Sequence, residues 1–269
     1  MKTITIANEK GGVGKTTTAQ HLTIGLAKKG FKVLLIDLDN QRNASSCFGD
    51  TGQEGIKRVF DLLNGEPIKN CIYRYKENEN IYLIYGDDRM SKADRIFVEM
   101  DSPYMLEEAL KEMKSFFDYI IIDTPPRSKS VAVENAFTTS DEIIIPMQAN
   151  GFSIDGLQKI LDTYEKAKKT TNPKLQIVGI LFTMYEDRTL FRRGMTKQME
   201  AISQKIQIPL FKTTIRRGIS MEEAQFKRTN IFDYEPKSKV AQDYQDFVNE
   251  YLKIEKKLNS TINEPKEER

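Results

Sequence analysis

The residues with the clearest chemical use form a glycine-rich loop near the start of the chain. Three glycines separate two lysines and precede two threonines, in the order Lys10-Gly11-Gly12-Val13-Gly14-Lys15-Thr16-Thr17. Glycines let consecutive backbone N–H groups turn toward a phosphate at the start of a helix. Lys15 then faces the β- and γ-phosphates of a nucleotide, and the Thr16 hydroxyl binds Mg²⁺. The loop therefore predicts a magnesium-nucleotide site, in which Lys10 is a second lysine that most such loops lack.

Carboxylates follow two apolar runs further along the chain. Residues 33–36 lead into Asp37 and Asp39, and residues 119–122 lead into Asp123. Alternate spacing makes Asp37 and Asp39 project from the same side of an extended strand. Phosphate-bound Mg²⁺ needs few protein ligands, and an attacking water needs an acceptor that orients it. We expect these acids to supply both, although a carboxylate after a strand can also simply cap the next segment.

Short apolar runs alternate with amphipathic stretches over most of the chain. We expect strands at residues 3–7, 33–36, 81–84, 119–122, 143–145 and 177–182. We expect helices at residues 16–29, 56–64, 105–116, 153–169, 190–206 and 239–257. This order predicts an α/β fold with a mainly parallel twisted sheet, helices on both faces and a ligand site beyond the carboxyl ends of the strands. Together with the glycine-rich phosphate loop, it indicates a P-loop NTPase fold.

Length and composition limit the domain organisation and the protein class. The 269 residues, 39% of them apolar, contain no Pro/Gly/Ser-rich linker, so we expect one domain at 1–258 and a flexible polar tail at 259–269. A formal net charge of +2 does not indicate a globally basic nucleic-acid binder. Cys47 and Cys71 lack metal-type spacing, and no apolar run approaches a membrane span. We expect a soluble, cytoplasmic protein.

These motifs together resemble the ParA/Soj/MinD-type ATPases, whose phosphate loop is a deviant Walker A motif with the extra lysine. The resemblance extends over nearly the whole chain, and its C-terminal part is most similar to the compact plasmid and chromosome partition ATPases. Beyond the loop it rests on four further segments: Asp37-Leu38-Asp39-Asn40-Gln41-Arg42-Asn43-Ala44, Asp123-Thr124-Pro125-Pro126, residues 179–185 and residues 215–239.

The resemblance implies an ATP- and Mg²⁺-dependent sandwich dimer. In such a dimer Lys10 would reach the phosphates of the neighbouring protomer, where a cation stabilises charge on the transferring phosphoryl group. Lys15 and Asp39 would complete the catalytic set, with Asp39 positioning the water. Thr16, Asp37 and Asp123 would belong to the Mg²⁺ shell. The loop residues, Met184 and Arg217 would contact the nucleotide.

Features that the sequence lacks favour the partition branch. Residues 252–269 are too poor in apolar residues for a membrane-anchoring helix, the cysteines do not suit an iron–sulfur cluster, and no tyrosine cluster follows Tyr251. The resemblance then implies a nucleoid-associated homodimer that binds nonspecific DNA and is released by a ParB-like centromere-binding protein. Candidate DNA contacts are Arg216, Arg217, Lys227, Arg228, Lys237 and Lys239. A second basic group is Arg188, Arg192, Arg193 and Lys197.

Several positions depart from the family pattern: Asn40, Arg42, Arg216, Ser220 and the segment Arg127-Ser128-Lys129, which replaces a loop of small residues. We expect the lone His21 to pack inside the protein. Two alternatives remain open at this stage. One is a scaffold of the same family that uses ATP to recruit protein partners without binding DNA. The other is a guanine-nucleotide switch, which lacks support because no Asn/Thr-Lys-x-Asp motif is present.

Overall fold

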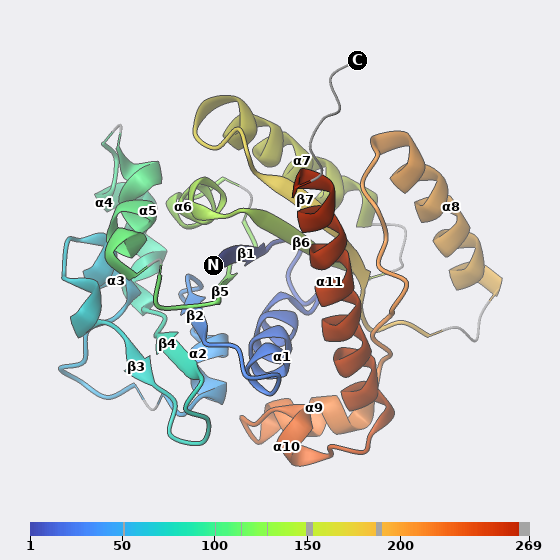
Figure 1. The fold of residues 1–269 in the computed structure, drawn as a ribbon, viewed down its shortest axis with the longest axis horizontal. Helices are drawn as coiled ribbons and strands as arrows, with labels where there is room; N and C mark the ends of the chain where they lie inside the picture. The colour runs from blue at the N-terminus through green and yellow to red at the C-terminus, as the bar shows by residue number, and fades with distance from the viewer. Residues whose placement is uncertain are drawn as a thin grey trace.

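The structure is a computed structural model that describes residues 1–50, 52–99, 101–113, 115–127, 129–148, 153–186 and 190–263. Its centre is a seven-stranded sheet in the order β3-β4-β2-β5-β1-β6-β7 (Figure 1). All neighbouring strands are parallel except the short edge strand β3, which is antiparallel to β4. The strands are β1 (Lys2–Ile6), β2 (Val33–Asp37), β3 (Tyr73–Arg74), β4 (Ile81–Ile84), β5 (Tyr119–Asp123), β6 (Glu142–Met147) and β7 (Gln176–Phe182).

Helices cover both faces of this sheet, as the alternating pattern predicts. They are α1 (Lys15–Ala27), α2 (Asn43–Cys47), α3 (Val59–Leu63), α4 (Ala93–Ile96), α5 (Met105–Leu110), α6 (Val131–Thr139), α7 (Ser153–Thr170), α8 (Leu190–Ile206), α9 (Ile219–Phe226), α10 (Ile231–Tyr234) and α11 (Lys239–Asn263). Helices α2, α4, α6, α9 and α10 were not expected, because elements of four to nine residues carry little periodic signal. Helix α11 continues beyond residue 258, where we expected the domain to end, and residues 264–269 lie outside the described residues.

The two faces of the sheet bury separate apolar cores, because successive strand residues point to opposite sides. In β2, Leu34 and Ile36 join one core, with side chains of α3, α5, α6, α7 and α8. Val33 and Leu35 join the other core, with side chains of α1, α2, α9, α10 and α11. The mainly parallel sheet is therefore buried on both faces, as strands of this kind require.

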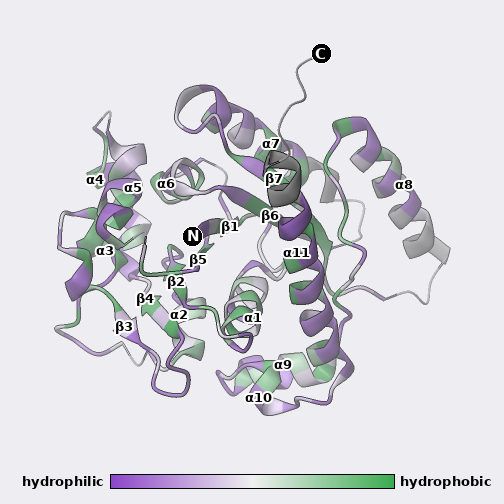
Figure 2. Ribbon diagram, in the orientation of Figure 1, coloured by the Kyte–Doolittle hydropathy of each residue, from purple (hydrophilic) through white to green (hydrophobic). Residues whose placement is uncertain are grey.

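Helix α11 packs closely against α1 on the second face. A Cβ atom at Gly25 of α1 would lie 2.6 Å from Cγ2 of Val248 on α11, so only glycine permits this approach. Along α11, Tyr244, Phe247 and Tyr251 are buried, while hydrophilic residues dominate its outer side (Figure 2). This packing holds the C-terminal third of the chain against the helix that begins at the glycine-rich loop.

Candidate nucleotide-binding site

The glycine-rich loop connects β1 to α1 at the centre of the sheet, beyond the carboxyl end of β1. Gly12 and Gly14 have φ values of 71° and 85°, in the left-handed region that glycine adopts without strain. Gly14 immediately precedes the first residue of α1, so the turn ends where the backbone N–H groups of a new helix point outward. The predicted phosphate loop therefore has the backbone form that anion binding requires.

Two polar side chains, one just before the loop and one distant in sequence, hold the loop in place. Thr183 Oγ1 donates a hydrogen bond to the Val13 carbonyl over 2.7 Å. Asn8 Nδ2 donates to the Pro146 carbonyl over 2.8 Å, while its Oδ1 accepts from the Lys10 backbone N–H. Sequence reasoning missed Asn8 and Thr183 as loop anchors. Their only sequence signal is a polar residue at the carboxyl end of an apolar run.

Lys15 is buried in a position that calls for a bound anion. Its side chain donates to the Lys10 carbonyl over 3.0 Å, and only 6% of the residue is exposed. Burial lowers the pKa of Lys15, and the nearby Asp123 and Asp39 oppose that shift. A phosphate placed beside the ammonium would restore the charge stabilisation that burial removes.

Asp123 is a buried carboxylate with neither oxygen accepting a hydrogen bond from a described residue. Burial raises its pKa well above the ordinary value, and the charge of Asp37, its register partner on β2, adds to the shift. A buried and unsatisfied carboxylate is costly, and a cation or its water shell would satisfy it. Asp123 and the neighbouring hydroxyl of Thr16 therefore fit a Mg²⁺ site that keeps most of its waters.

Asp37 and Asp39 lie in different environments despite their alternate spacing, because β2 ends at Asp37. The Asp37 carboxylate accepts hydrogen bonds from the backbone N–H of Asp39 and from both the backbone N–H and the hydroxyl of Ser45. Burial raises its pKa to about 6. Asp39 instead lines a cleft, where one oxygen accepts from the Gln41 backbone N–H. Asp37 thus holds the start of α2, and Asp39 faces the cleft.

The cleft has a volume of about 640 Å³ and lies over the glycine-rich loop. Its wall is formed by the loop, the first turns of α1, the segment after β2 together with α2, the segment after β5, and two positions later in the chain. Residues of the wall include Gly11, Gly12, Gly14, Lys15, Thr16, Thr17, Asp39, Asn40, Pro125, Pro126, Arg127, Met184 and Gln225. The structure therefore brings Asp39 and Met184 to the loop, with Asp37, Asp123 and Val13 buried around it. Lys10 is half-buried and does not line the cleft of its own chain.

The C-terminal helices contact the start of α1 through two side chains. Gln225 Nε2 of α9 donates to the Thr17 hydroxyl over 2.9 Å. His21 is fully buried, with Nδ1 2.7 Å from the Thr17 carbonyl and Nε2 accepting from the Ile231 backbone N–H. Its ring stacks on Tyr244, and burial lowers its pKa to about 4. His21 therefore packs inside the protein, as predicted from the sequence, and its lowered pKa favours the neutral ring.

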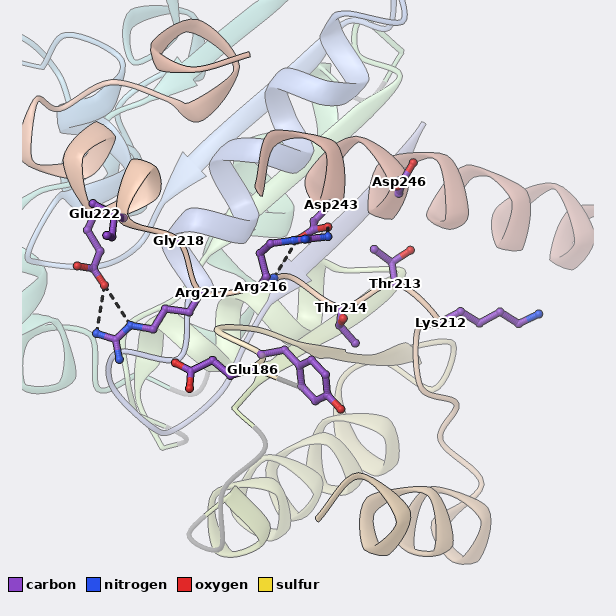
Figure 3. Close-up of a pocket in the computed structure, with 12 residues that line it drawn as sticks. Glu186, Lys212, Thr213, Thr214, Arg216, Arg217, Gly218, Glu222, Asp243 and Asp246 are labelled. Atoms are coloured by element: carbon purple, nitrogen blue, oxygen red, sulfur yellow. Dashed lines mark hydrogen bonds and ion pairs between the residues drawn. The ribbon is translucent and has the colours of Figure 1, made fainter. Parts of the chain in front are cut away.

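Arg216 and Arg217 line a separate hollow of about 980 Å³ beside α9 and α11 (Figure 3). Arg216 makes a two-pronged contact with Asp243, with both N–O distances 2.7 Å. Arg217 contacts Glu222 at 3.2 Å. The structure does not bring Arg217 into the cleft with the loop, although it was predicted as a nucleotide contact. This larger hollow lacks the loop, so the smaller cleft is the candidate nucleotide site.

The other candidate DNA contacts are exposed. Lys227, Arg228, Lys237 and Lys239 lie in or beside the segment from α9 to the start of α11. The Lys227 ammonium lies over the ring of Tyr234, 4.7 Å from its centre. We call residues 216–239 the C-terminal basic segment. Arg188 of the second basic group lies outside the described residues, whereas Arg192, Arg193 and Lys197 belong to α8.

The parallel sheet, the glycine-rich loop and the acids at the ends of β2 and β5 define a P-loop nucleoside triphosphatase. Comparisons with known proteins agree. The AAA domain family matches residues 1–177. The sporulation initiation inhibitor protein Soj of Bacillus subtilis is 34% identical over 250 residues, which cover 93% of this chain and 97% of Soj.

Two solved structures extend the comparison to the fold. A plasmid partition protein of Borrelia burgdorferi bound to AMPPNP is 26% identical to this chain, with a TM-score of 0.76. The match covers 94% of this chain and 98% of the Borrelia chain. A cobyrinic acid a,c-diamide synthase of Mycobacterium smegmatis with bound ADP and magnesium has a TM-score of 0.81 at 26% identity, with 95% and 96% coverage. The chain belongs to the Soj/ParA family of P-loop ATPases.

Within the described residues, no helix has the length and apolar character that crossing a bilayer demands. Within the same part of the chain, no three His, Cys, Asp or Glu side chains are grouped as a metal-holding cluster.

Proposed function

We propose that this chain is a DNA-segregation ATPase. It binds and slowly hydrolyses ATP with Mg²⁺, forms an ATP-dependent sandwich dimer and binds DNA without sequence preference. A ParB-like centromere-binding partner stimulates hydrolysis and releases the dimer from DNA. The dimer works in the cytoplasm on the nucleoid. The observation that carries the proposal is the buried, unsatisfied Asp123 beside the buried Lys15 in a cleft formed by the two-lysine loop.

The side chains of the cleft divide the chemical work. The loop N–H groups and Lys15 bind the phosphates, and Asp39 accepts a hydrogen bond from the attacking water. Bound Mg²⁺ would neutralise charge on the β- and γ-phosphates. Its shell would include Thr16 and Asp123, with Asp37 acting mainly through the hydrogen bonds that hold residues 39–45. Met184 lines the cleft and would contact the nucleotide there.

Lys10 would act on the nucleotide of a second copy of the chain. Its carbonyl supports Lys15 within its own protomer, and it does not line its own cleft. A lysine so placed can supply a cation to a neighbouring active site, as an arginine finger does in trans. Hydrolysis would then require the dimer, and ATP would time how long the dimer lasts.

The main test is an electrophoretic mobility shift with random-sequence DNA, with ATP or ADP, over a series of salt concentrations. We expect binding with ATP that weakens steeply with salt, because phosphate contacts release counterions. An ATP-dependent dimer without an ATP-dependent DNA shift would instead favour the scaffold function. Absence of ATP binding would refute both functions.

Two variants test the site. Lys10→Ala should abolish partner-stimulated hydrolysis while leaving ATP binding by the monomer intact. Asp39→Ala should keep ATP bound and trap the dimer, which gel filtration detects. Undiminished turnover in either variant would contradict the assigned role of that residue.

A further inference from the structure

Arg127 stands in the wall of the nucleotide cleft without a role in the chemistry described above. It follows Pro125 and Pro126, whose rings restrict the backbone after Asp123. Its backbone N–H donates to the Pro125 carbonyl over 2.8 Å, which closes a tight turn. Arg127 shares the cleft wall with Lys15 and Asp39. The turn therefore places Arg127 in the wall of the cleft that Lys15 and Asp39 also line, with its guanidinium directed toward Asp94.

The ion pair that Arg127 makes with Asp94 is weak. Its Nη1 lies 3.8 Å from Oδ2 of Asp94, and 66% of the Arg127 side chain and 42% of the Asp94 side chain are exposed. A single contact at that distance between exposed groups contributes little to stability. The guanidinium can therefore leave Asp94 for a stronger anion at small cost.

Asp94 keeps a second, better contact when Arg127 moves. Its Oδ1 accepts a hydrogen bond from the backbone N–H of Val131, the first residue of α6, over 2.8 Å. That contact holds α4 to the start of α6 whether or not Arg127 is paired. One oxygen of Asp94 thus makes a structural contact with α6, and the other makes a contact with Arg127 that another anion can replace.

We propose that Arg127 binds the terminal phosphate of ATP in its own cleft and thereby distinguishes ATP from ADP. A triphosphate carries more negative charge than Lys15 and one Mg²⁺ neutralise, and a guanidinium binds phosphate through two parallel N–H donors. Asp123, four residues earlier on the same segment, is one of the residues that would hold Mg²⁺, which would neutralise charge on the terminal phosphates. In the ATP state Arg127 exchanges Asp94 for the phosphate.

This inference rests on the proposed ATP-binding function, and isothermal titration calorimetry separates the two. The titrants are Mg²⁺-AMPPNP and Mg²⁺-ADP. Arg127→Ala should weaken AMPPNP binding about tenfold and change ADP binding less than twofold, because one charge-assisted contact to the last phosphate is lost. Arg95→Ala removes an exposed arginine on α4 that does not line the cleft, and it should change neither affinity.

A second variant, Asp94→Asn, should change the affinity for AMPPNP in the opposite direction. The amide oxygen can still accept from Val131, so α6 keeps its contact, but the charge that competes for Arg127 is gone. AMPPNP binding should then tighten by up to about threefold, with ADP binding unchanged.

If the wild-type chain binds neither nucleotide, the proposed function itself fails. If it binds both and Arg127→Ala weakens them equally or not at all, only the Arg127 proposal is overturned.

Discussion

The nucleotide cleft and the C-terminal basic segment hold their charges in opposite ways. In the cleft, Lys15 and Asp123 are buried and only partly compensated, so the folded protein holds charge that a ligand would stabilise. In the C-terminal basic segment, Lys227 and Lys237 are exposed, and Arg216 is paired with an acid. Burial makes the cleft selective for one small anion, whereas exposed charge gives a surface that attracts any polyanion and is screened by salt.

The two regions are nevertheless joined. Gln225 connects α9 to Thr17 in the cleft wall, and His21 connects α1 to α10. A change at the start of α1 therefore has a direct path to the segment that carries the exposed lysines. Whether the basic segment depends on the cleft is the question that the following predictions address.

The largest expected effect is that of Lys15→Ala. Removing a preorganised cation from the phosphates should lower ATP hydrolysis by at least about 100-fold. If the cleft controls the basic segment, DNA binding with ATP should also fall to its level with ADP. Steady-state phosphate release and mobility shifts measure the two effects, with Lys29→Ala in the exposed turn after α1 as the control. ATP-dependent DNA binding by Lys15→Ala would show that the regions act independently.

The packing of His21, which connects α1 to α10, should become less stable in acid. His21 has a pKa of about 4 when folded and about 6.5 when unfolded, so protons bind the unfolded chain preferentially between these values. The free energy of unfolding should therefore fall as pH drops from 6.5 to 4, by on the order of 3 kcal/mol from this residue. Urea unfolding of wild type and His21→Gln at both pH values checks this. Equal losses in the two proteins would contradict it.

Asp123→Asn should stabilise the nucleotide-free protein while impairing hydrolysis. Removing a buried carboxylate that accepts no hydrogen bond from the described part of the chain should raise the free energy of unfolding by roughly 1–3 kcal/mol. Because the pKa of Asp123 is raised on folding, wild type loses stability as pH rises above about 4. The advantage of Asp123→Asn should therefore grow with pH. Calorimetric melting measures it, with the exposed Asp88→Asn as control, and a lower melting temperature would refute the assignment.

The smallest effect should separate paired from exposed basic residues. Lys227→Gln combined with Lys237→Gln should weaken DNA binding about tenfold and reduce the slope of log affinity against log salt by about 2. Arg216→Gln should change DNA binding less, because its charge is already paired with Asp243. Fluorescence anisotropy with labelled random DNA tests this order. A larger effect of Arg216→Gln would place the DNA surface at the hollow of Figure 3.

Local patterns predicted much of the fold because their physical causes are local. Helix α8 and strand β4 have the predicted bounds, and the loop begins α1 within one residue of the expected position. The antiparallel edge strand β3 was missed because two residues carry no periodicity. Helices α9 and α10 were missed for a similar reason, and they carry the contacts to Thr17 and His21.

The sequence by itself determined the phosphate loop and the acids at the strand ends. Glycine conformation and strand-to-helix order follow from neighbouring residues. Tertiary structure alone decided which of these side chains are hydrogen-bonded, which are buried without a partner and which are paired with an opposite charge. It hydrogen-bonded Asp37 to Ser45, left Asp123 without a hydrogen-bond partner among the described residues, and paired Arg216 with a residue 27 positions away. Burial and charge pairing depend on groups that meet only when the chain folds, so no local pattern encodes them.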